Sequence, residues 1–342
     1  MSGERSPSSD QPSSDRPSSD RPSSKPVSGV DADLQCVMVT GACGNLGRRL
    51  VRRLHRRAKV LALDRRPFPG KPKDVDHHEV DLRRQRVKEV FRQRGQAALV
   101  HLGVMHNPRR GSEEHHTWNV AGFQKLMQYA QQFGLKKVVL LSSANVYGPR
   151  PDNPQFLREE APLMAAGRFS EMRDLVELDM CAQSYAWRAD GPEVVILRPT
   201  HILGMVQNAP SNYLRLRRVP TVLGFDPMLQ VVHQDDVLDA VELALAPGVR
   251  GVYNIAGPSG ARLSKMLDLL NRTSVPLPAS LARLGLDGLF RWKMSSFPAP
   301  ELDFIRYVCM VDDSKARREL GYSPRYDLAK TLQAVDLERW VA

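Results

Sequence analysis

Short apolar runs alternate with longer amphipathic stretches from residue 36 onward, and this alternation limits the folds open to the chain. The apolar runs have the length of buried strands, and most stretches between them have the length of helices. The alternation predicts an α/β fold, a Rossmann-like doubly wound parallel sheet with helices on both faces. Strands are predicted before residue 200 at 36–40, 59–64, 76–82, 97–103, 136–143 and 193–199. Helices are predicted directly after the first strand and at about 83–94, 118–133 and 170–188.

The regular pattern weakens after residue 200, which indicates a second, less regular part. We predict a Rossmann core at 34–204 and 229–257, with a smaller C-terminal substrate-binding lobe at 205–228 and 258–342. Ligands of doubly wound sheets bind beyond the carboxyl ends of the strands. The site is therefore expected where the strands end.

The first thirty residues repeat the letters PSSD and contain very few apolar side chains. Such a segment cannot bury enough apolar surface to offset its conformational entropy, so residues 1–30 are predicted to be a disordered tail. The tail lacks the apolar region of a secretory signal. No run of eighteen apolar residues occurs, so no membrane span is predicted. The four scattered cysteines indicate reduced thiols and a cytoplasmic location.

The chain carries a net charge of +11, and part of that charge lies on the helix after the first strand. A basic helix can attract phosphates or an acidic partner. No nucleic-acid-binding motif accompanies it, so we favour a solvated helix face and predict no nucleic-acid partner. The arginines of this helix are Arg48, Arg49, Arg52, Arg53, Arg56 and Arg57.

The letters VTGACGNLG (39–47) place Gly41, Gly44 and Gly47 between the first strand and the first helix. Glycines at this turn let a pyrophosphate approach backbone N–H groups, and the helix N-terminus attracts the phosphate charge. Asp64 ends the second strand, where a carboxylate can accept hydrogen bonds from an adenosine ribose. This arrangement predicts a dinucleotide site.

Arg65 and Arg66 follow Asp64 and bear on the choice of dinucleotide. Either arginine can pair with the 2′-phosphate of NADP, whereas Asp64 repels that phosphate. We therefore predict NAD as the cofactor and rank NADP below it.

The chain resembles the extended short-chain dehydrogenases/reductases, in the NAD-dependent epimerase/dehydratase family typified by UDP-glucose 4-epimerase. The resemblance rests on the glycine motif and on HLG (101–103), NVAG (119–122), SSANVYG (142–148), LRPTHILG (197–204), HQDDV (233–237) and GVYNIAG (251–257), in the family's order. It implies that the cofactor lies against Gly41, Gly44, Asn45, Leu46, Gly47, Asp64, Arg65, Asp81, Leu82, Leu102, Gly103, Ser142 and Ile202.

The family's acid/base chemistry is expected to depend on a Tyr-x-x-x-Lys pair, assisted by a serine and an asparagine. The resemblance places Ser143 and Asn119 at the last two positions. The tyrosine and lysine are missing. One register puts Phe169 and Arg173 in their place, and a second puts Glu171 and Leu175 there.

The candidate catalytic residues are therefore Ser143, Asn119, Arg173 and Glu171. Tyr147, His101 and His106 are further acid/base candidates by residue type alone. The pairs His77-His78 and His115-His116 have no companion at metal-ligand spacing, so no metal site is predicted.

Two functions remain open at this stage. The first is an NAD(P)-dependent epimerase, dehydratase or reductase that acts on a small-molecule substrate, a nucleotide sugar or a similar alcohol, with altered acid/base residues. The second is a non-catalytic protein that binds the dinucleotide as a sensor or scaffold. The resemblance also allows a homodimer.

Overall fold

The computed structural model describes residues 36–94, 97–105, 112–167, 170–188, 190–206, 209–281, 303 and 306–336. The predicted tail at 1–30, Phe169 and His106 lie outside the described residues. Among the residues described, no helix is long and apolar enough to cross a membrane.

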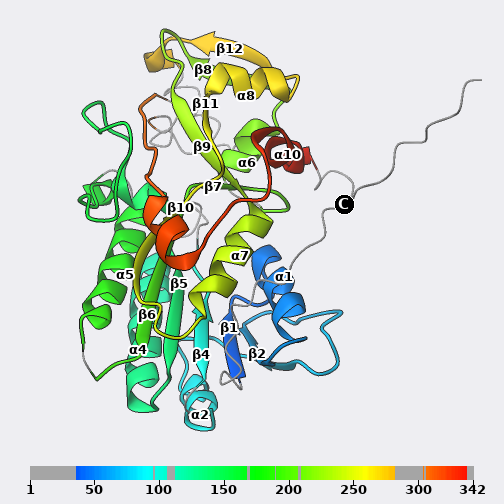
Figure 1. The fold of residues 1–342 in the computed structure, drawn as a ribbon, viewed down its shortest axis with the longest axis vertical. Coiled ribbons are helices and arrows are strands. Elements are labelled where there is room, and N and C mark those ends of the chain that lie inside the picture. Colours follow the sequence, from blue (N-terminus) through cyan, green and yellow to red (C-terminus); the bar gives the residue numbers. More distant parts are fainter. Residues whose placement is uncertain are drawn as a thin grey trace, which may run out of the picture.

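A seven-stranded sheet forms the centre of the structure, with the strand order β10-β6-β5-β4-β1-β2-β3 (Figure 1). Every neighbouring pair in it is parallel. The order reverses direction between β1 and β4, which creates the crevice where doubly wound sheets bind ligands. Its strands are β1 (Cys36–Thr40), β2 (Lys59–Asp64), β3 (Asp76–Glu79), β4 (Ala98–His101), β5 (Lys137–Leu141), β6 (Glu193–Pro199) and β10 (Gly251–Ile255).

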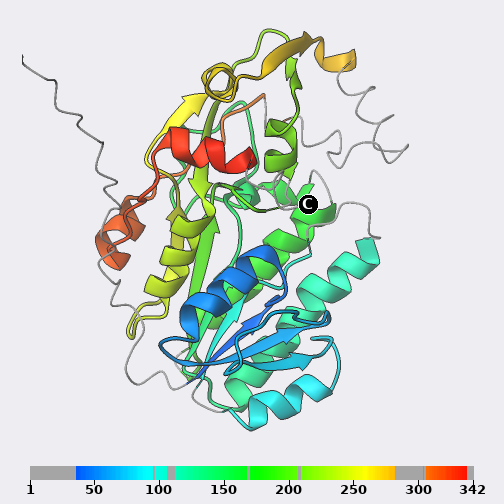
Figure 2. The same cartoon turned by 90° about the vertical axis from the view of Figure 1, so that its right-hand side faces the viewer.

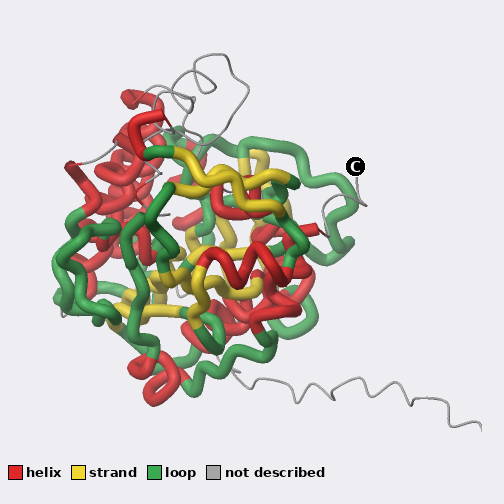
Figure 3. Tube along the Cα trace, turned by 90° about the horizontal axis from the view of Figure 1, so that it is seen from above, coloured by secondary structure: helices red, strands yellow, loops and turns green. Residues whose placement is uncertain are grey.

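Helices cover both faces of this sheet, and strands lie between helices when the molecule is seen from above (Figure 3). On one face, α1 (Asn45–Leu54) and α7 (Gln234–Ala244) pack their apolar residues into one buried cluster with the strands. On the other face, α2 (Arg86–Arg92), α4 (Gly122–Gln132) and α5 (Ser170–Ala186) form a second cluster. The predicted Rossmann-like α/β fold is confirmed.

The predicted helix at 118–133 is divided in two. A π-helical segment, η1 (Thr117–Ala121), joins α3 (Ser112–His116) to α4. π-Helical turns frequently occur at functional sites, and this one contains Asn119, a candidate site residue.

Two small sheets lie beyond the carboxyl ends of the central strands (Figures 1 and 2). One has the order β11-β9-β7, and the other pairs β12 with β8. β9 pairs with both β7 and β11, so the chain leaves the central sheet after β6 and returns to it at β10. The division into a core at 34–204 and 229–257 and a lobe at 205–228 and 258–342 stays a prediction. The strands are β7 (His201–Leu203), β8 (Arg218–Val222), β9 (Met228–His233), β11 (Gly260–Arg262) and β12 (Thr273–Leu277). The helical segments nearby are α6 (Ala209–Leu214), α8 (Leu263–Leu269), α10 (Leu328–Gln333) and, beside β10, η5 (Ala316–Leu320).

The basic side of α1 faces α7 rather than solvent alone. Arg53 lies within salt-bridge distance of Asp235, Asp239 and Glu242, with its closest contact 2.7 Å from Asp239. Arg49 and Arg57 pair with Asp235 and Glu242 in the same way. The interpretation of this helix as a solvated basic face missed these pairs, which α7 supplies from about 185 residues further along the chain, although Arg57 remains exposed.

Candidate functional site

The glycine turn between β1 and α1 fits a close-packed phosphate-binding loop. Gly41 has a φ of +70°, and a Cβ atom there would lie 2.8 Å from the backbone of Leu102 and Gly103. A Cβ atom at Gly47 would lie 2.2 Å from the carbonyl oxygen of Gly41. Neither position can hold a larger residue without movement of the backbone.

The N-terminus of α1 lies open at this turn. Gly44 is the N-cap, and no side chain accepts a hydrogen bond from the first N–H groups of the helix. Asn45, Leu46 and Gly47 therefore present the backbone donors and the positive end of the helix dipole that bind anions. The residues present fit a dinucleotide pyrophosphate.

Asp64 is the last residue of β2, beside this loop, and its carboxylate accepts several hydrogen bonds. It accepts hydrogen bonds from the backbone N–H groups of Cys43 (2.9 Å) and Arg66 (3.0 Å), and from the Arg66 guanidinium (3.1 Å). Burial alone would raise the pKa of Asp64, but these hydrogen bonds outweigh burial and hold the pKa below its usual range. The backbone bonds fix the carboxylate against the loop, whereas the Arg66 side chain is 57% exposed and can move away.

The remaining residues predicted to contact adenosine gather around Gly103. The Trp118 indole donates a hydrogen bond to the Gly103 carbonyl oxygen at 2.6 Å. The Arg65 guanidinium lies 4.9 Å from the Trp118 ring centroid. Leu82 Cδ1 lies 3.4 Å from where a Cβ atom of Gly103 would be. The Asp81 carboxylate accepts hydrogen bonds from Arg83.

Ser143 lies two residues after the end of β5, at the edge where the parallel strands end. It is the N-cap of η2 (Ala144–Tyr147), and its Oγ accepts the Asn145 N–H at 3.1 Å. The hydroxyl proton of Ser143 is not used in that bond. Asn119 is buried, and its side-chain amide bonds both backbone groups of Met105.

A buried polar network links β5, α5 and β6 behind Ser143. The Ser142 hydroxyl donates to Asp179 at 2.6 Å, and Asp179 forms a salt bridge with Arg198 at 2.7 Å. Arg198 donates to the Tyr147 hydroxyl, which in turn donates to Asn254 Oδ1. Asp179 and Arg198 are almost completely buried, so this network fixes the position of α5 on the sheet.

Two of the acid/base candidates chosen by residue type are held inside the fold. Burial raises the pKa of Tyr147 to about 12, and its hydroxyl is occupied by Arg198 and Asn254. Burial lowers the pKa of His101 to about 4, and its Nδ1 lies 2.7 Å from the Thr40 hydroxyl. Neither group is suited to proton transfer near neutral pH.

The first turns of α5 contain residues that the two possible alignments place at the missing Tyr-x-x-x-Lys pair. The Arg173 side chain is 52% exposed and lies 3.4 Å from the Asp174 carboxylate. Glu171 belongs to α5, but its side chain lies outside the described part of the structure, as does all of Phe169. Ile202, another predicted cofactor contact, lies on β7 just past the end of β6 and is partly buried. The roles of Arg173, Glu171 and Ile202 stay predictions.

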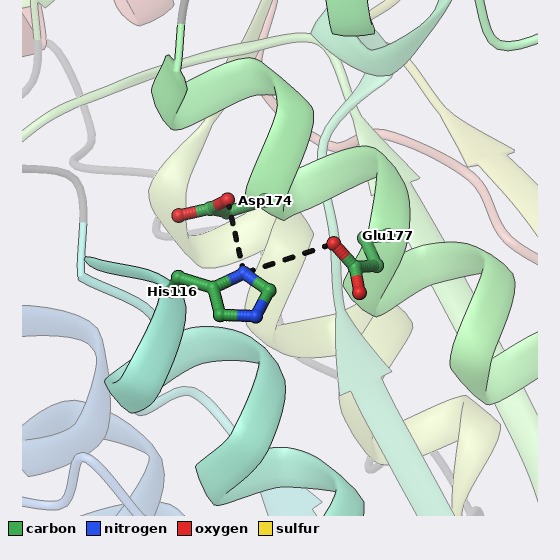
Figure 4. Close-up of side chains that lie close together, drawn as sticks. All are labelled: His116, Asp174 and Glu177. Atoms are coloured by element: carbon green, nitrogen blue, oxygen red, sulfur yellow. Dashed lines mark ion pairs between the residues drawn. The ribbon is translucent and has the colours of Figure 1, made fainter. Parts of the chain in front are cut away.

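The fold also brings together three residues that sequence spacing did not connect. His116, at the end of α3, lies against Asp174 and Glu177 of α5 (Figure 4). The carboxylates follow the histidine by about sixty residues, so the spacing of residues around the histidine pairs gives no sign of them. The prediction of no metal site rested on the spacing of residues in the sequence alone.

Comparison with known protein families identifies the family of this chain. Residues 37–256 match the model of the NAD dependent epimerase/dehydratase family. This match spans well over half of the chain. The chain belongs to this family.

Relatives and solved structures extend this result. An uncharacterized protein of Mycobacterium tuberculosis is 28% identical over 312 residues, which is 88% of this chain and 82% of the relative. Sterol demethylase protein B of Methylococcus capsulatus is 29% identical over 87% of this chain and 96% of its own length. The UDP-glucose 4-epimerase of Thermus thermophilus, solved with NAD, superposes with a TM-score of 0.71 at 21% identity, over 90% of this chain and all of that one. The solved neighbours of this epimerase/dehydratase fold therefore include complexes with NAD, the predicted cofactor.

Proposed function

We propose that this epimerase/dehydratase family member binds NAD and uses it to oxidise, epimerise or dehydrate a nucleotide sugar or a related alcohol, with acid/base residues other than Tyr-x-x-x-Lys. The observation that carries the proposal is the glycine turn at α1. Gly41 and Gly47 leave no room for a side chain, and the helix N-terminus beside them has no side-chain cap.

The cofactor would be held by three sets of residues. The N–H groups at the start of α1 would bind the pyrophosphate. Asp64 would accept the ribose hydroxyls once Arg66 moves away, and Leu82 and Gly103 would lie beside the adenine. When bound, NAD accepts and returns a hydride, which is the chemistry that the side chains of the chain do not supply.

NAD is expected to bind more tightly than NADP. The backbone bonds from Cys43 and Arg66 hold the Asp64 carboxylate in its ionised form at the ribose position, where it repels a 2′-phosphate. Arg66 opposes this preference because its guanidinium partly neutralises Asp64. An Arg66→Ala substitution should therefore strengthen the preference for NAD, and Asp64→Ala should weaken it.

The substrate would lie at the carboxyl edge of β5. The hydroxyl proton of Ser143 can be donated to a substrate oxygen there, since the bond with Asn145 uses only a lone pair of Oγ. Glu171 would accept the proton of the reacting hydroxyl, and the Arg173 guanidinium would bind ribose hydroxyls. Two solved neighbours named MoeE5 contain UDP-glucuronic acid or UDP-glucose together with NAD, which supports a nucleotide sugar as the substrate class.

The test uses the purified full-length protein. NAD and NADP would be titrated by calorimetry, and UDP-glucose and UDP-galactose would then be followed by nicotinamide absorbance and chromatography. Ser143→Ala and Glu171→Gln should each lower turnover by about 10²- to 10⁴-fold without loss of NAD binding, whereas Ser184→Ala and Glu160→Gln serve as matched controls. NAD binding without turnover of any nucleotide sugar would favour the sensor or scaffold function. Failure to bind either dinucleotide would overturn the proposal.

A further inference from the structure

His116, Asp174 and Glu177 form a compact group of potential ligands between α3 and α5. His116 Nδ1 lies 3.5 Å from Asp174 Oδ1 and 3.7 Å from Glu177 Oε2. The three ligand atoms all lie within 4.8 Å of one another. Figure 4 shows the imidazole beside α5 with its Nδ1 directed toward both carboxylates.

The two distances from His116 Nδ1 are close to those of a tetrahedral metal site. Zinc binds nitrogen and oxygen at about 2.0–2.2 Å, so two ligands at a tetrahedral angle lie about 3.3–3.6 Å apart. The distances from Nδ1 to the two carboxylates fall in or close to that range without an ion present. One imidazole and two carboxylates provide three protein ligands, and the exposure of His116 and Glu177 leaves access for water as a fourth.

The charge around Asp174 provides a second, independent observation. Asp174 is completely buried, and its Oδ2 accepts no hydrogen bond from any residue that the structure describes. Among the described residues, the contacts of its Oδ1 are long, at 3.4 Å to Arg173 and 3.5 Å to His116. A buried carboxylate is unfavourable unless it is paired or coordinates a metal. Asp174 therefore lacks the close partners that buried carboxylates elsewhere in this chain have, such as Asp179 with Arg198 at 2.7 Å.

We propose that His116, Asp174 and Glu177 bind one Zn²⁺ ion, which joins α3 to α5. The histidine favours zinc over magnesium or calcium, because those ions prefer oxygen ligands alone. The two carboxylates balance the charge of the ion. Arg173 is half exposed and can turn away from Asp174 when the metal replaces it. Zinc binding is measured without NAD, so this test can fail independently of the proposed function, although Arg173 takes part in both proposals.

The first test measures zinc binding directly. Full-length protein would be treated with a chelator, dialysed and titrated with ZnCl₂ by calorimetry, and zinc per chain would be measured by elemental analysis. We expect one zinc ion per chain. His116→Gln and Glu177→Gln should each weaken binding by more than about tenfold, the lower end of the effect of losing even an outer-shell partner of a metal site. Both residues are partly exposed, so both variants should fold.

His55→Gln is the matched control. His55 pairs with the exposed Asp74 at 3.1 Å and belongs to no group of three ligands among the described residues, so its loss should leave zinc affinity unchanged. In a second measurement, Co²⁺ should give the visible absorption of a four-coordinate site, and this signal should disappear in His116→Gln. The proposal is overturned if the protein binds no zinc, if both α3/α5 variants bind zinc as tightly as the unmodified chain, or if His55→Gln loses affinity equally.

Discussion

Helices α1 and α5 both begin where strands of the central sheet end, but their charged side chains differ in how closely they are paired with opposite charges. The arginines on one side of α1 are matched by three acidic residues of α7. On α5, within the part of the chain that the structure describes, Asp174 has long contacts with His116 and Arg173, and Glu177 has a long contact with His116. The comparison indicates that these arginines of α1 are already paired in the fold, whereas the start of α5 has charges that a ligand can still satisfy.

The two helices also differ in what holds them to the sheet. α1 is attached by apolar packing and by the glycine turn, whose backbone atoms touch Leu102 and Gly103. α5 is attached by apolar packing and by the buried pair of Asp179 with Arg198. Substitutions at each attachment should therefore have different consequences for stability and for binding.

The largest effect is expected from Asp179→Asn. This change leaves the Arg198 guanidinium buried without its counter-charge, which typically costs about 3–5 kcal/mol of stability. Chemical denaturation should show that loss as a lower midpoint. The exposed pair of Arg150 with Asp152 provides the control, since Asp152→Asn should leave the midpoint nearly unchanged. Equal, small effects of the two changes would show that the buried pair does not hold α5.

A Gly47→Ala substitution should have the next largest effect, on the α1 side. The added methyl group would lie 2.2 Å from the Gly41 carbonyl oxygen, so the turn must open. Overpacking of this kind costs about 1–3 kcal/mol, and we expect NAD affinity to fall by at least about tenfold because the phosphate-binding turn is the part that moves. Gly167→Ala is the matched control, as nothing lies within 4 Å of its added Cβ. Unchanged NAD affinity in Gly47→Ala would contradict this account of the loop.

Tyr147→Phe distinguishes a structural tyrosine from a catalytic one. Its hydroxyl bonds Arg198 and Asn254, both buried, so its removal should lower stability by about 1–2 kcal/mol. NAD affinity and any turnover should persist, since a phenol with a pKa of about 12 does not exchange protons readily near pH 7. Complete loss of turnover in a folded Tyr147→Phe protein would place this residue in the chemistry instead.

The smallest effect is expected from Arg53→Ala. Its salt bridges to α7 are partly exposed to solvent, with 27% of the arginine side chain accessible, so we expect a loss of about 1 kcal/mol. The loss should shrink as salt is added, because salt screens exposed ion pairs. Arg52, which is exposed on the same helix, is the control. A salt-independent loss would mean that packing, not charge, connects α1 to α7.

Much of the fold could be predicted from the sequence, because its signals are local. Strands β1, β2 and β6 begin and end where their apolar runs do, and α5 begins at the predicted residue. The pairing of β9 with β7 and β11 could not be predicted, because strand length and apolar character do not reveal which partner a strand will pair with.

The candidate site, like the fold, could be predicted from the sequence only in part. The sequence by itself determined the phosphate-binding turn, because Gly41, Gly44, Gly47 and the strand and helix beside them lie within a few residues of one another. Only the tertiary structure decided that Tyr147 is buried against Arg198, that the α1 arginines meet α7, and that His116 meets Asp174 and Glu177. These contacts join residues about fifty to two hundred positions apart in the sequence. Their strength depends on burial and distance, and neither can be read from the amino-acid sequence.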